Sequence, residues 1–270
     1  MSVVSADTLG LAELAGLFNA GFSDYLLPMQ LDEAALRDHV EANDIELRAS
    51  RVVVAGRPAA FALLGVRGAD AWVGGMATIP DERRRGLGEQ ALVATLAAAA
   101  ERDCRTVWLE VVDANHAAIA LYAKLGFEVV RDLAVWSLPA IGSGPAAGRA
   151  IDERSAQAWI AANRPSHEPW QRADAVLGRL RARGAPLHGL VVERDGAIAA
   201  AIVYRDGAAP SVLQAAAVDV AAAADALRAA AAGEREIRFT NAPAAEPFSQ
   251  ALQQLGGRLA ARQHEMRLGL

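Results

Sequence analysis

The stretch Ile79-Pro80-Asp81-Glu82-Arg83-Arg84-Arg85-Gly86-Leu87-Gly88-Glu89-Gln90 decides the fold. It follows an apolar, strand-like run and precedes a helix-forming run from Ala91 to Ala100. Two glycines at a helix start let the backbone approach a ligand closely, and the unpaired N–H groups of a helix N-terminus attract anions. Three neighbouring arginines add positive charge and forked donors. The stretch therefore predicts a phosphate or pyrophosphate site, with an ordinary basic helix start as the alternative.

A second motif follows after one helix and one strand. Trp108-Leu109-Glu110-Val111 is typical of a buried strand, and it is followed by Asn115, Ala118, Ala120, Leu121, Tyr122 and Leu125-Gly126-Phe127. Together with Arg83-x-x-Gly86-x-Gly88, this pattern resembles the acyl-CoA signature of the GCN5-related N-acetyltransferase (GNAT) superfamily. The resemblance covers about residues 1 to 138. The two halves in this order are more specific than either half alone.

Composition bounds the class of protein. The chain has 270 residues, which favours two domains, and its 53% hydrophobic and 22% charged residues are typical of a globular protein. A net charge of −5 argues against a general nucleic-acid binder, which needs a basic face. No run approaches the roughly 20 apolar residues that span a bilayer, and the N-terminus lacks a signal-peptide pattern. We therefore expect a cytoplasmic protein with neither a nucleic acid nor a membrane as its partner.

The single cysteine, Cys104, excludes an internal disulfide framework and a multi-cysteine metal site. No neighbour in the sequence favours a reactive thiolate, so we expect a packed structural thiol rather than a nucleophile. We expect no metal ion. The sequence leaves the oligomeric state open.

The first half of the chain predicts a mixed α/β sheet. Helical spacing covers 8–20 and 32–42, and strand-like segments at 52–55, 60–66 and 71–78 are joined by turn residues into an antiparallel meander. The glycine-loop helix then runs to about residue 102, followed by a strand at 107–112, a helix at 115–124 and a strand pair within 127–138. This order matches the acyl-CoA N-acyltransferase (GNAT) fold.

The second half repeats the order of elements. A linker rich in Pro, Gly, Ser and Ala at 139–150 separates a predicted catalytic domain, 1–138, from a second domain, 151–270. Predicted helices there cover 152–163, 171–183, 220–232 and 248–255, and strands cover 187–193, 197–204, 212–218, 236–240 and a run from 259. We predict two tandem GNAT folds. The second is degenerate, because Val220-Ala221-Ala222 stands where the glycine loop stood, so we expect one active site per chain.

The resemblance implies that an amine attacks the thioester of a bound acyl-CoA directly, with acetyl-CoA as the donor. The strand segment Met76, Ala77 and Thr78 would pair with the pantetheine arm, across a gap that the family opens between this strand and 107–112. Gly74-Gly75 fits a β-bulge, or a glycine turn. Asn115 would bond the pantetheine arm, cap its helix, or do both. The pyrophosphate would meet the Arg83 side chain and the amides of Arg84, Arg85, Gly86, Leu87, Gly88 and Glu89.

Two side chains are candidates for the chemistry. Tyr122 matches the family tyrosine whose hydroxyl protonates the leaving thiolate, and core packing is the alternative. Glu110 lies in an otherwise apolar strand and is the candidate base, because burial raises the pKa of a carboxylate toward neutrality. A glutamate that faces solvent or an arginine is the alternative, and some relatives use a water chain. Glu46 and Asp44 are reserve candidates.

The acceptor pocket is expected to consist of the 22–28 loop, with Phe22 and Tyr25, and the second helix. Between residues 21 and 50 there are seven acids and two arginines, a balance that favours a cationic amine. A solvated helix face explains most of these charges equally well. In the second domain, His167 and Trp170 are expected to line the acceptor or a domain interface, with a structural loop as the alternative.

These observations predict an acyl-CoA-dependent N-acyltransferase that acetylates a primary amine. One alternative is a catalytically silent acyl-CoA-binding or regulatory module. Another is an O- or thiol-directed acyltransferase on the same fold. The sequence does not identify the amine.

Overall fold

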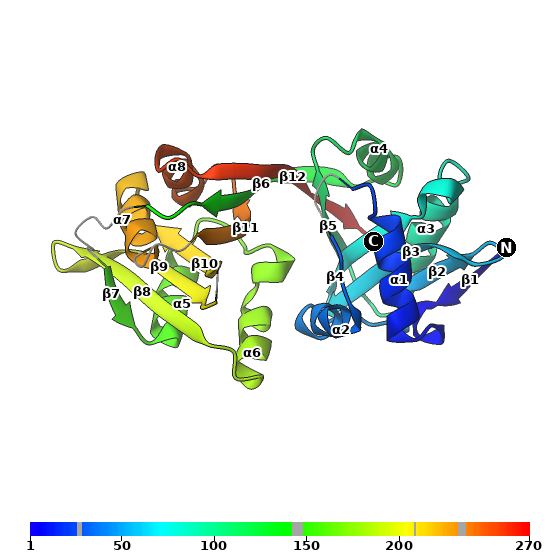
Figure 1. Cartoon of the computed structure of the whole chain (residues 1–270), viewed down its shortest axis with the longest axis horizontal. Coiled ribbons are helices and arrows are strands. Elements are labelled where there is room, and N and C mark those ends of the chain that lie inside the picture. The colour runs from blue at the N-terminus through cyan, green and yellow to red at the C-terminus, as the bar shows by residue number, and fades with distance from the viewer. Residues whose placement is uncertain (26–28, 142–147, 208, 232–235) are drawn as a thin grey trace. The chain divides into compact units, whose positions relative to one another are not determined.

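The computed structural model describes residues 1–25, 29–141, 148–207, 209–231 and 236–270. The chain forms two compact units, which we call unit 1 (Met1–Val130 with Glu265–Leu270) and unit 2 (Arg131–His264). Each unit combines a β-sheet with helices (Figure 1). The predicted α/β class is confirmed.

Unit 1 contains the elements that helical and alternating patterns predicted. The antiparallel meander is present, and each of its strands pairs with the next. A single strand, β6, replaces the strand pair predicted within 127–138, because no Gly, Pro or Asn interrupts this run. A short first strand, β1, was not predicted. The elements of the first copy, of which the last strand continues into unit 2, are β1 (Ser2–Ser5), α1 (Leu11–Gly21), α2 (Glu33–Ala42), β2 (Arg51–Val54), β3 (Pro58–Arg67), β4 (Asp70–Thr78), α3 (Leu87–Ala100), β5 (Thr106–Val112), α4 (His116–Lys124) and β6 (Glu128–Leu138).

Unit 2 repeats this order, as predicted. Its first hairpin closes through Asp195 and Gly196, both with positive φ, between the paired residues Arg194 and Ala197. Of the predicted linker, residues 142–147 lie outside the described residues, and Gly148 begins β7. The elements are β7 (Gly148–Ile151), α5 (Glu153–Asn163), α6 (Asp174–Ala182), β8 (Leu187–Arg194), β9 (Ala197–Arg205), β10 (Ser211–Ala217), α7 (Val220–Ala230), β11 (Ile237–Pro243), α8 (Pro247–Gln254) and β12 (Arg258–Gly269).

The two copies exchange their last strands. β6 follows α4 of the first copy, yet it pairs with β11 in unit 2, where Trp136 lies opposite Phe239. β12 (red in Figure 1) follows α8 of the second copy, and its end lies beside β5 in unit 1. There the Leu270 amide donates to the Arg105 carbonyl, and Met266 joins the core. The strand order is β1-β2-β3-β4-β5-β12 in unit 1 and β12-β6-β11-β10-β9-β8-β7 in unit 2.

The unit boundaries therefore differ from the predicted division at residues 138 and 151. Alternating apolar residues identify a strand, but they do not identify the strand beside which it pairs. The chain leaves unit 1 within β6 and returns to it within β12.

The core of unit 1 lies around α3, β4, β5 and α4, where Leu64, Leu92 and Leu109 are almost fully buried. Cys104 is a free, buried thiol in this core, and burial raises its pKa, in agreement with the predicted structural role.

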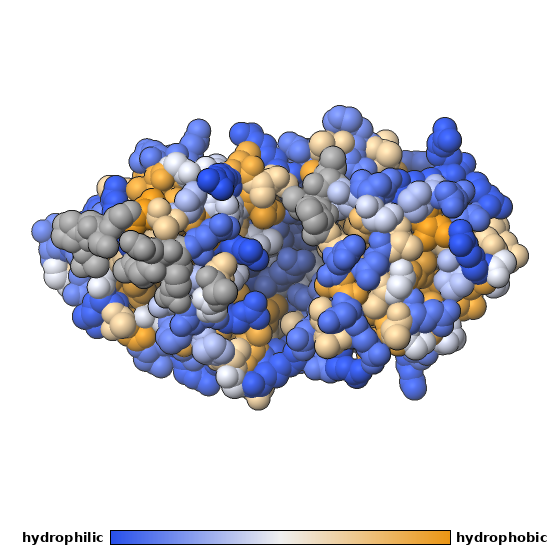
Figure 2. Space-filling view, in the orientation of Figure 1, coloured by the Kyte–Doolittle hydropathy of each residue, from blue (hydrophilic) through white to orange (hydrophobic). Residues whose placement is uncertain are grey.

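The face shown in Figure 2 mixes hydrophilic residues with smaller hydrophobic areas. Across the described ranges, no helix has the length and apolar character needed to cross a membrane.

Candidate active site

The candidate site of unit 1 begins where β4 and β5 part. These strands pair in parallel from Asp70 and Thr106 to Trp72 and Trp108, and no further registered pair follows in the described part of the chain. β4 continues along β3 as far as Thr78, so the stretch from Met76 has β3 on one side only. A strand with one open edge offers N–H and C=O groups to an extended ligand. The gap implied by the resemblance is therefore present.

A β-bulge lies at the mouth of this gap. Leu63 pairs with Gly75 and Leu64 pairs with Val73, which leaves Gly74 as the extra residue, as predicted. A Cβ atom at Gly74 would lie only 2.3 Å from the Trp72 ring, so no larger residue fits.

Sequence reasoning missed His39, which fixes this bulge from α2. Its Nε2 lies 2.9 Å from the Gly74 carbonyl oxygen, which can only accept, so this nitrogen carries the proton. The other ring nitrogen lies 3.3 Å from Asn43 Nδ2. Burial lowers the pKa of His39, which favours the neutral ring. The signal in the sequence was weak, because His39 stands among charged residues of a helix with few buried positions.

The glycine loop next to the gap presents backbone hydrogen-bond donors. Arg84 and Gly86 have φ angles of 61° and 77°, the left-handed region that shapes the turn. Gly86 is the N-cap of α3, and no side chain within the described ranges caps this helix. The first N–H groups of α3 therefore lack intrahelical partners, at the positive end of the helix dipole. A Cβ atom at Gly88 would lie 3.0 Å from Thr78 Oγ1, so the α3 N-terminus closely approaches the open stretch of β4.

The arginines of the loop are placed differently from one another. Arg83 donates to both carboxylate oxygens of Asp24 at 2.6 and 2.7 Å, and to the carbonyls of Gly21 and Thr78 at 3.2 and 3.1 Å. Its side chain thus joins the end of α1 to β4, and this pairing lowers the pKa of Asp24. Arg84 is exposed, and Arg85 is exposed beside Glu82, with which it forms an ion pair.

The packing role of Tyr122 is present, and its hydroxyl lies at the gap where a proton donor was predicted. Its ring packs in the core, 5.8 Å from the Phe127 ring, and its hydroxyl lies 3.8 Å from Met76 Sδ at the open stretch of β4. Burial, followed by the nearby Tyr25, raises the pKa of Tyr122, so the hydroxyl keeps its proton and can donate it. Burial also raises the pKa of Tyr25, which forms hydrogen bonds with the Asn115 side chain and the Val112 backbone.

Asn115 is the N-cap of α4, where its Oδ1 accepts from the Ala118 amide at 3.2 Å. The capping role is therefore present, and the position also lies at the end of β5 beside the gap. Phe22 packs 4.6 Å from Phe18 and 5.1 Å from Tyr25, ring to ring, in an aromatic cluster at the end of α1. Residues 26–28 of the predicted acceptor loop lie outside the described residues.

Glu110 is half-buried and has a hydrogen-bond donor of its own. Its Oε2 accepts from Trp72 Nε1 at 2.7 Å, at the point where the gap opens. The two reserve carboxylates are engaged elsewhere, since Asp44 pairs with Arg67 and Glu46 pairs with Arg102, each at 2.7 Å.

His167 and Trp170 belong to unit 2. His167 is exposed, whereas Trp170 is only 8% exposed and leaves little surface for an acceptor to touch.

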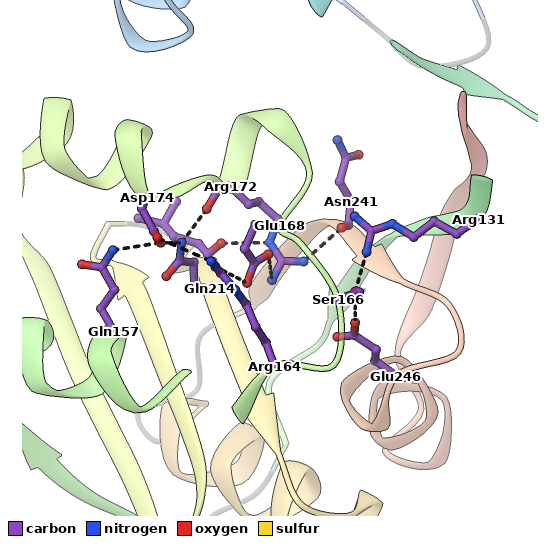
Figure 3. A network of polar contacts seen from close by, with 11 residues as sticks. Arg131, Gln157, Arg164, Ser166, Glu168, Arg172, Asp174, Gln214, Asn241 and Glu246 are labelled. Atoms are coloured by element: carbon purple, nitrogen blue, oxygen red, sulfur yellow. Dashed lines mark hydrogen bonds and ion pairs between the residues drawn. The ribbon is translucent and has the colours of Figure 1, made fainter. Parts of the chain in front are cut away.

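The equivalent gap in unit 2 is filled by the chain itself. β10 and β11 pair only at Ser211–Val212 in the described residues, and the register shifts after Val212. The Arg172 guanidinium lies here, donating to the carbonyls of Leu213 at 2.8 Å and Asn241 at 3.0 Å, and so it bridges both strands (Figure 3). Arg172 is buried, pairs with Glu168 at 3.1 Å and lies over the Phe239 ring.

The helix start that corresponds to the glycine loop is also occupied. Asp219 is the N-cap of α7, and its carboxylate accepts from the Ala222 amide at 2.7 Å. Arg194 pairs with the same carboxylate at 3.2 Å. An anionic ligand at this helix would have to displace a carboxylate of the chain.

In comparisons with known proteins, the family match falls within unit 1. The sequence profile of the Acetyltransferase (GNAT) family matches residues 17–127. The ribosomal protein bS18-alanine N-acetyltransferase of Escherichia coli (strain K12) is 43% identical over 72 residues, which are 27% of this chain and 49% of that protein. Its counterpart in Salmonella typhimurium is 45% identical over 71 residues, 26% of this chain and 48% of that protein. The chain spans about half the length of the curated relatives it matches.

Solved structures resemble the whole chain. A GCN5-related N-acetyltransferase from Sphaerobacter thermophilus superimposes with a TM-score of 0.71 at 18% identity, over 99% of this chain and 95% of that chain. A tandem GNAT protein from the clavulanic acid biosynthesis pathway gives a TM-score of 0.65 at 16% identity, over 99% and 98%. These similarities show the fold, which is the predicted pair of tandem GNAT folds.

Proposed function

We propose that this chain transfers acetyl from acetyl-CoA to a primary amine in unit 1, and the match of residues 17–127 to the sequence profile of the Acetyltransferase (GNAT) family supports this proposal. One observation carries the proposal: the uncapped N-terminus of α3 lies against the one stretch of β4 that has an open edge. The first feature suits a pyrophosphate, and the second suits the amide-bearing pantetheine arm.

The proposed chemistry is direct transfer. The amine nitrogen attacks the thioester carbonyl carbon and loses a proton to Glu110, directly or through water. The carbon–sulfur bond then breaks, and the leaving thiolate takes a proton from the Tyr122 hydroxyl. The products are an amide and free CoA. Met76 marks the expected path of the sulfur, since its backbone belongs to the open stretch and its sulfur contacts the Tyr122 hydroxyl.

The acceptor is proposed only as a class. The relatives named above are N-acetyltransferases of an alanine in ribosomal protein bS18, so a peptide that begins with alanine is the first acceptor to test. Free primary amines, polyamines and amino sugars complete the panel.

The test is a thiol-release assay of the full chain with acetyl-CoA and this panel, alongside titration calorimetry with CoA. We expect one CoA site per chain and amine-dependent release of free thiol. Binding without thiol release would favour a silent acyl-CoA-binding module, and release only with hydroxyl or thiol acceptors would favour O- or S-transfer. A stoichiometry of two would overturn the assignment of unit 2.

A further inference from the structure

Trp72 and Glu110 form a partly buried contact at the point where the gap opens. The indole Nε1 donates to Glu110 Oε2 at 2.7 Å, and Trp72 is 1% exposed. Trp72 forms the last β4–β5 pair, opposite Trp108, and Glu110 follows Trp108 by two residues. Because side chains two apart point to the same face of a sheet, Glu110 is the diagonal neighbour of Trp72.

The indole is held in this position by the bulge. A Cβ atom at Gly74 would lie 2.3 and 2.7 Å from two carbons of the Trp72 ring, so the ring occupies the space that any other residue would need. The His39 ring lies 6.1 Å from the Trp72 ring, and His39 also fixes the Gly74 carbonyl. The bulge that shapes the open stretch of β4 therefore also sets the direction of the indole N–H.

We propose that Trp72 is a positioning residue that orients Glu110 and keeps its carboxylate ionised, ready to accept a proton. The proposal rests on the proposed function, in which Glu110 takes the proton of the amine. A donor that bonds a carboxylate stabilises its charged form more than its protonated form. Loss of the indole N–H should therefore make Glu110 harder to ionise and leave its side chain less well directed.

The substitution Trp72→Phe removes the N–H and keeps an aromatic ring in the same place. Trp108→Phe is the matched control, because Trp108 lies opposite in the same strand pair and its Nε1 lies 3.3 Å from the remote carboxylate of Asp70. CoA binding and thermal unfolding should change little in Trp108→Phe. CoA affinity of Trp72→Phe should stay within a few-fold of wild type, which shows that unit 1 has folded.

The first measurement needs no acceptor. In the full ¹⁵N-labelled chain, the indole N–H signal that disappears in Trp72→Phe should shift with pH as Glu110 titrates. In Glu110→Gln the same signal should no longer follow that titration. If its pH dependence persists in Glu110→Gln, the contact does not exist in solution and the proposal is overturned.

The second measurement is the pH profile of kcat/KM with acetyl-CoA and the best acceptor of the panel. A base must be ionised to act, so activity rises with pH through its pKa. In Trp72→Phe the acidic limb should move upward by roughly one pH unit, with about tenfold lower activity at pH 6 and recovery at high pH. Trp108→Phe should keep the wild-type profile.

The outcomes separate the two proposals. An active wild type whose Trp72→Phe and Trp108→Phe variants share one profile would overturn the positioning role alone. A uniform loss of activity in Trp72→Phe at every pH would also overturn it, because that is the result of a purely structural role. A wild type that releases no thiol with any acceptor would instead overturn the proposed function.

Discussion

At the scale of single residues, the proposed chemistry depends on side chains that are held by packing while their polar group reaches the gap. Tyr122 is the clearest case, because the core holds its ring while its hydroxyl reaches the open stretch of β4. His39 has a supporting role, since it joins α2 to the Gly74 carbonyl at the bulge.

Tyr122→Phe removes only the hydroxyl. We expect unchanged thermal stability and CoA affinity, with turnover lower by about 10²–10⁴ because the leaving thiolate loses its proton donor. Tyr204→Phe, in β9 of unit 2, is the matched control and should leave turnover unchanged. Steady-state assays with acetyl-CoA would decide, and activity of Tyr122→Phe within a few-fold of wild type would remove this residue from the mechanism.

His39 should give a stability term that depends on pH. Burial lowers its pKa in the folded chain, so between that value and about 6.5 the unfolded chain binds more protons. This contribution is complete above about pH 6.5 and is lost as the pH falls toward the lowered pKa. We expect Tm to fall more steeply between pH 7.5 and 5.5 in wild type than in His39→Gln. The control is His116→Gln, at an exposed histidine, which should keep the wild-type dependence of Tm on pH. An equal dependence in His39→Gln and wild type would contradict the stabilising role of the neutral His39.

At the scale of elements, the site is the meeting of one helix start with one strand edge. A helix start is not unusual by itself, because α2, α4, α5 and α7 also begin next to a polar N-cap residue. Those four are capped by an Asp or Asn side chain, whereas the N-cap of α3 is Gly86, which like the N-caps of α1, α6 and α8 makes no side-chain hydrogen bond in the described residues. The missing cap leaves donors for a ligand.

Gly86→Val tests this arrangement, with Gly56→Val as its control. Both glycines have positive φ, 77° and 82°, and no atom lies within 4 Å of a Cβ built on either one. The two substitutions should therefore strain the backbone similarly, by about 1–2 kcal/mol. Only Gly86→Val places a side chain where the pyrophosphate should lie, so calorimetry should show lost CoA binding in this variant alone. Equal losses in both variants would show strain rather than a blocked site.

Arg172 should contribute to stability and not to catalysis. It is 4% exposed, and its removal would leave the buried Glu168 without its nearest cation. We expect Arg172→Leu to lower the free energy of unfolding by about 3 kcal/mol without changing the CoA stoichiometry. The largely exposed Arg154, changed to Leu, should have almost no effect in the same urea titration. A CoA site newly formed in Arg172→Leu would show that this side chain blocks a functional gap.

Sequence reasoning succeeded where the local backbone accepts only one type of residue. Gly74-Gly75 predicted the bulge, because a Cβ atom at Gly74 would collide with the Trp72 ring, and Gly86 predicted the left-handed turn, because its φ is positive. It failed where the role of a residue depends on a contact with a residue far away in the sequence. The contacts of His39 with Gly74 and of Trp72 with Glu110 join residues 35 and 38 positions apart, and no local pattern encodes them.

At the scale of the whole molecule, unit 1 is built from both ends of the chain. Met266 is 1% exposed and packs in the core that also holds Tyr122, and a Cβ atom at Gly126 would lie 3.3 Å from Leu268. A domain cut from the chain at the predicted boundary therefore lacks a strand of its own sheet. The element order was predictable, but the exchange was not, because β6 and β12 have similar patterns that suit either sheet.

Truncation after Leu138 tests this dependence. The fragment retains the glycine loop, Tyr122 and Glu110, yet it loses β12 and exposes the edge of β5. We expect aggregation and no measurable CoA binding. Residues 1–130 fused through a flexible linker to residues 258–270 should recover a soluble unit that binds CoA. A soluble 1–138 fragment with wild-type CoA affinity would show that β12 is dispensable.

The exchange also fixes the order in which the protein can mature. The glycine loop is translated early, but the strand beside β5 is translated only after the rest of unit 2. A chain that stops before Glu265 contains every residue of the proposed catalytic centre but lacks the strand that completes the sheet of unit 1. Such incomplete chains should therefore bind no CoA, and unit 1 should be able to react only after β12 has been translated.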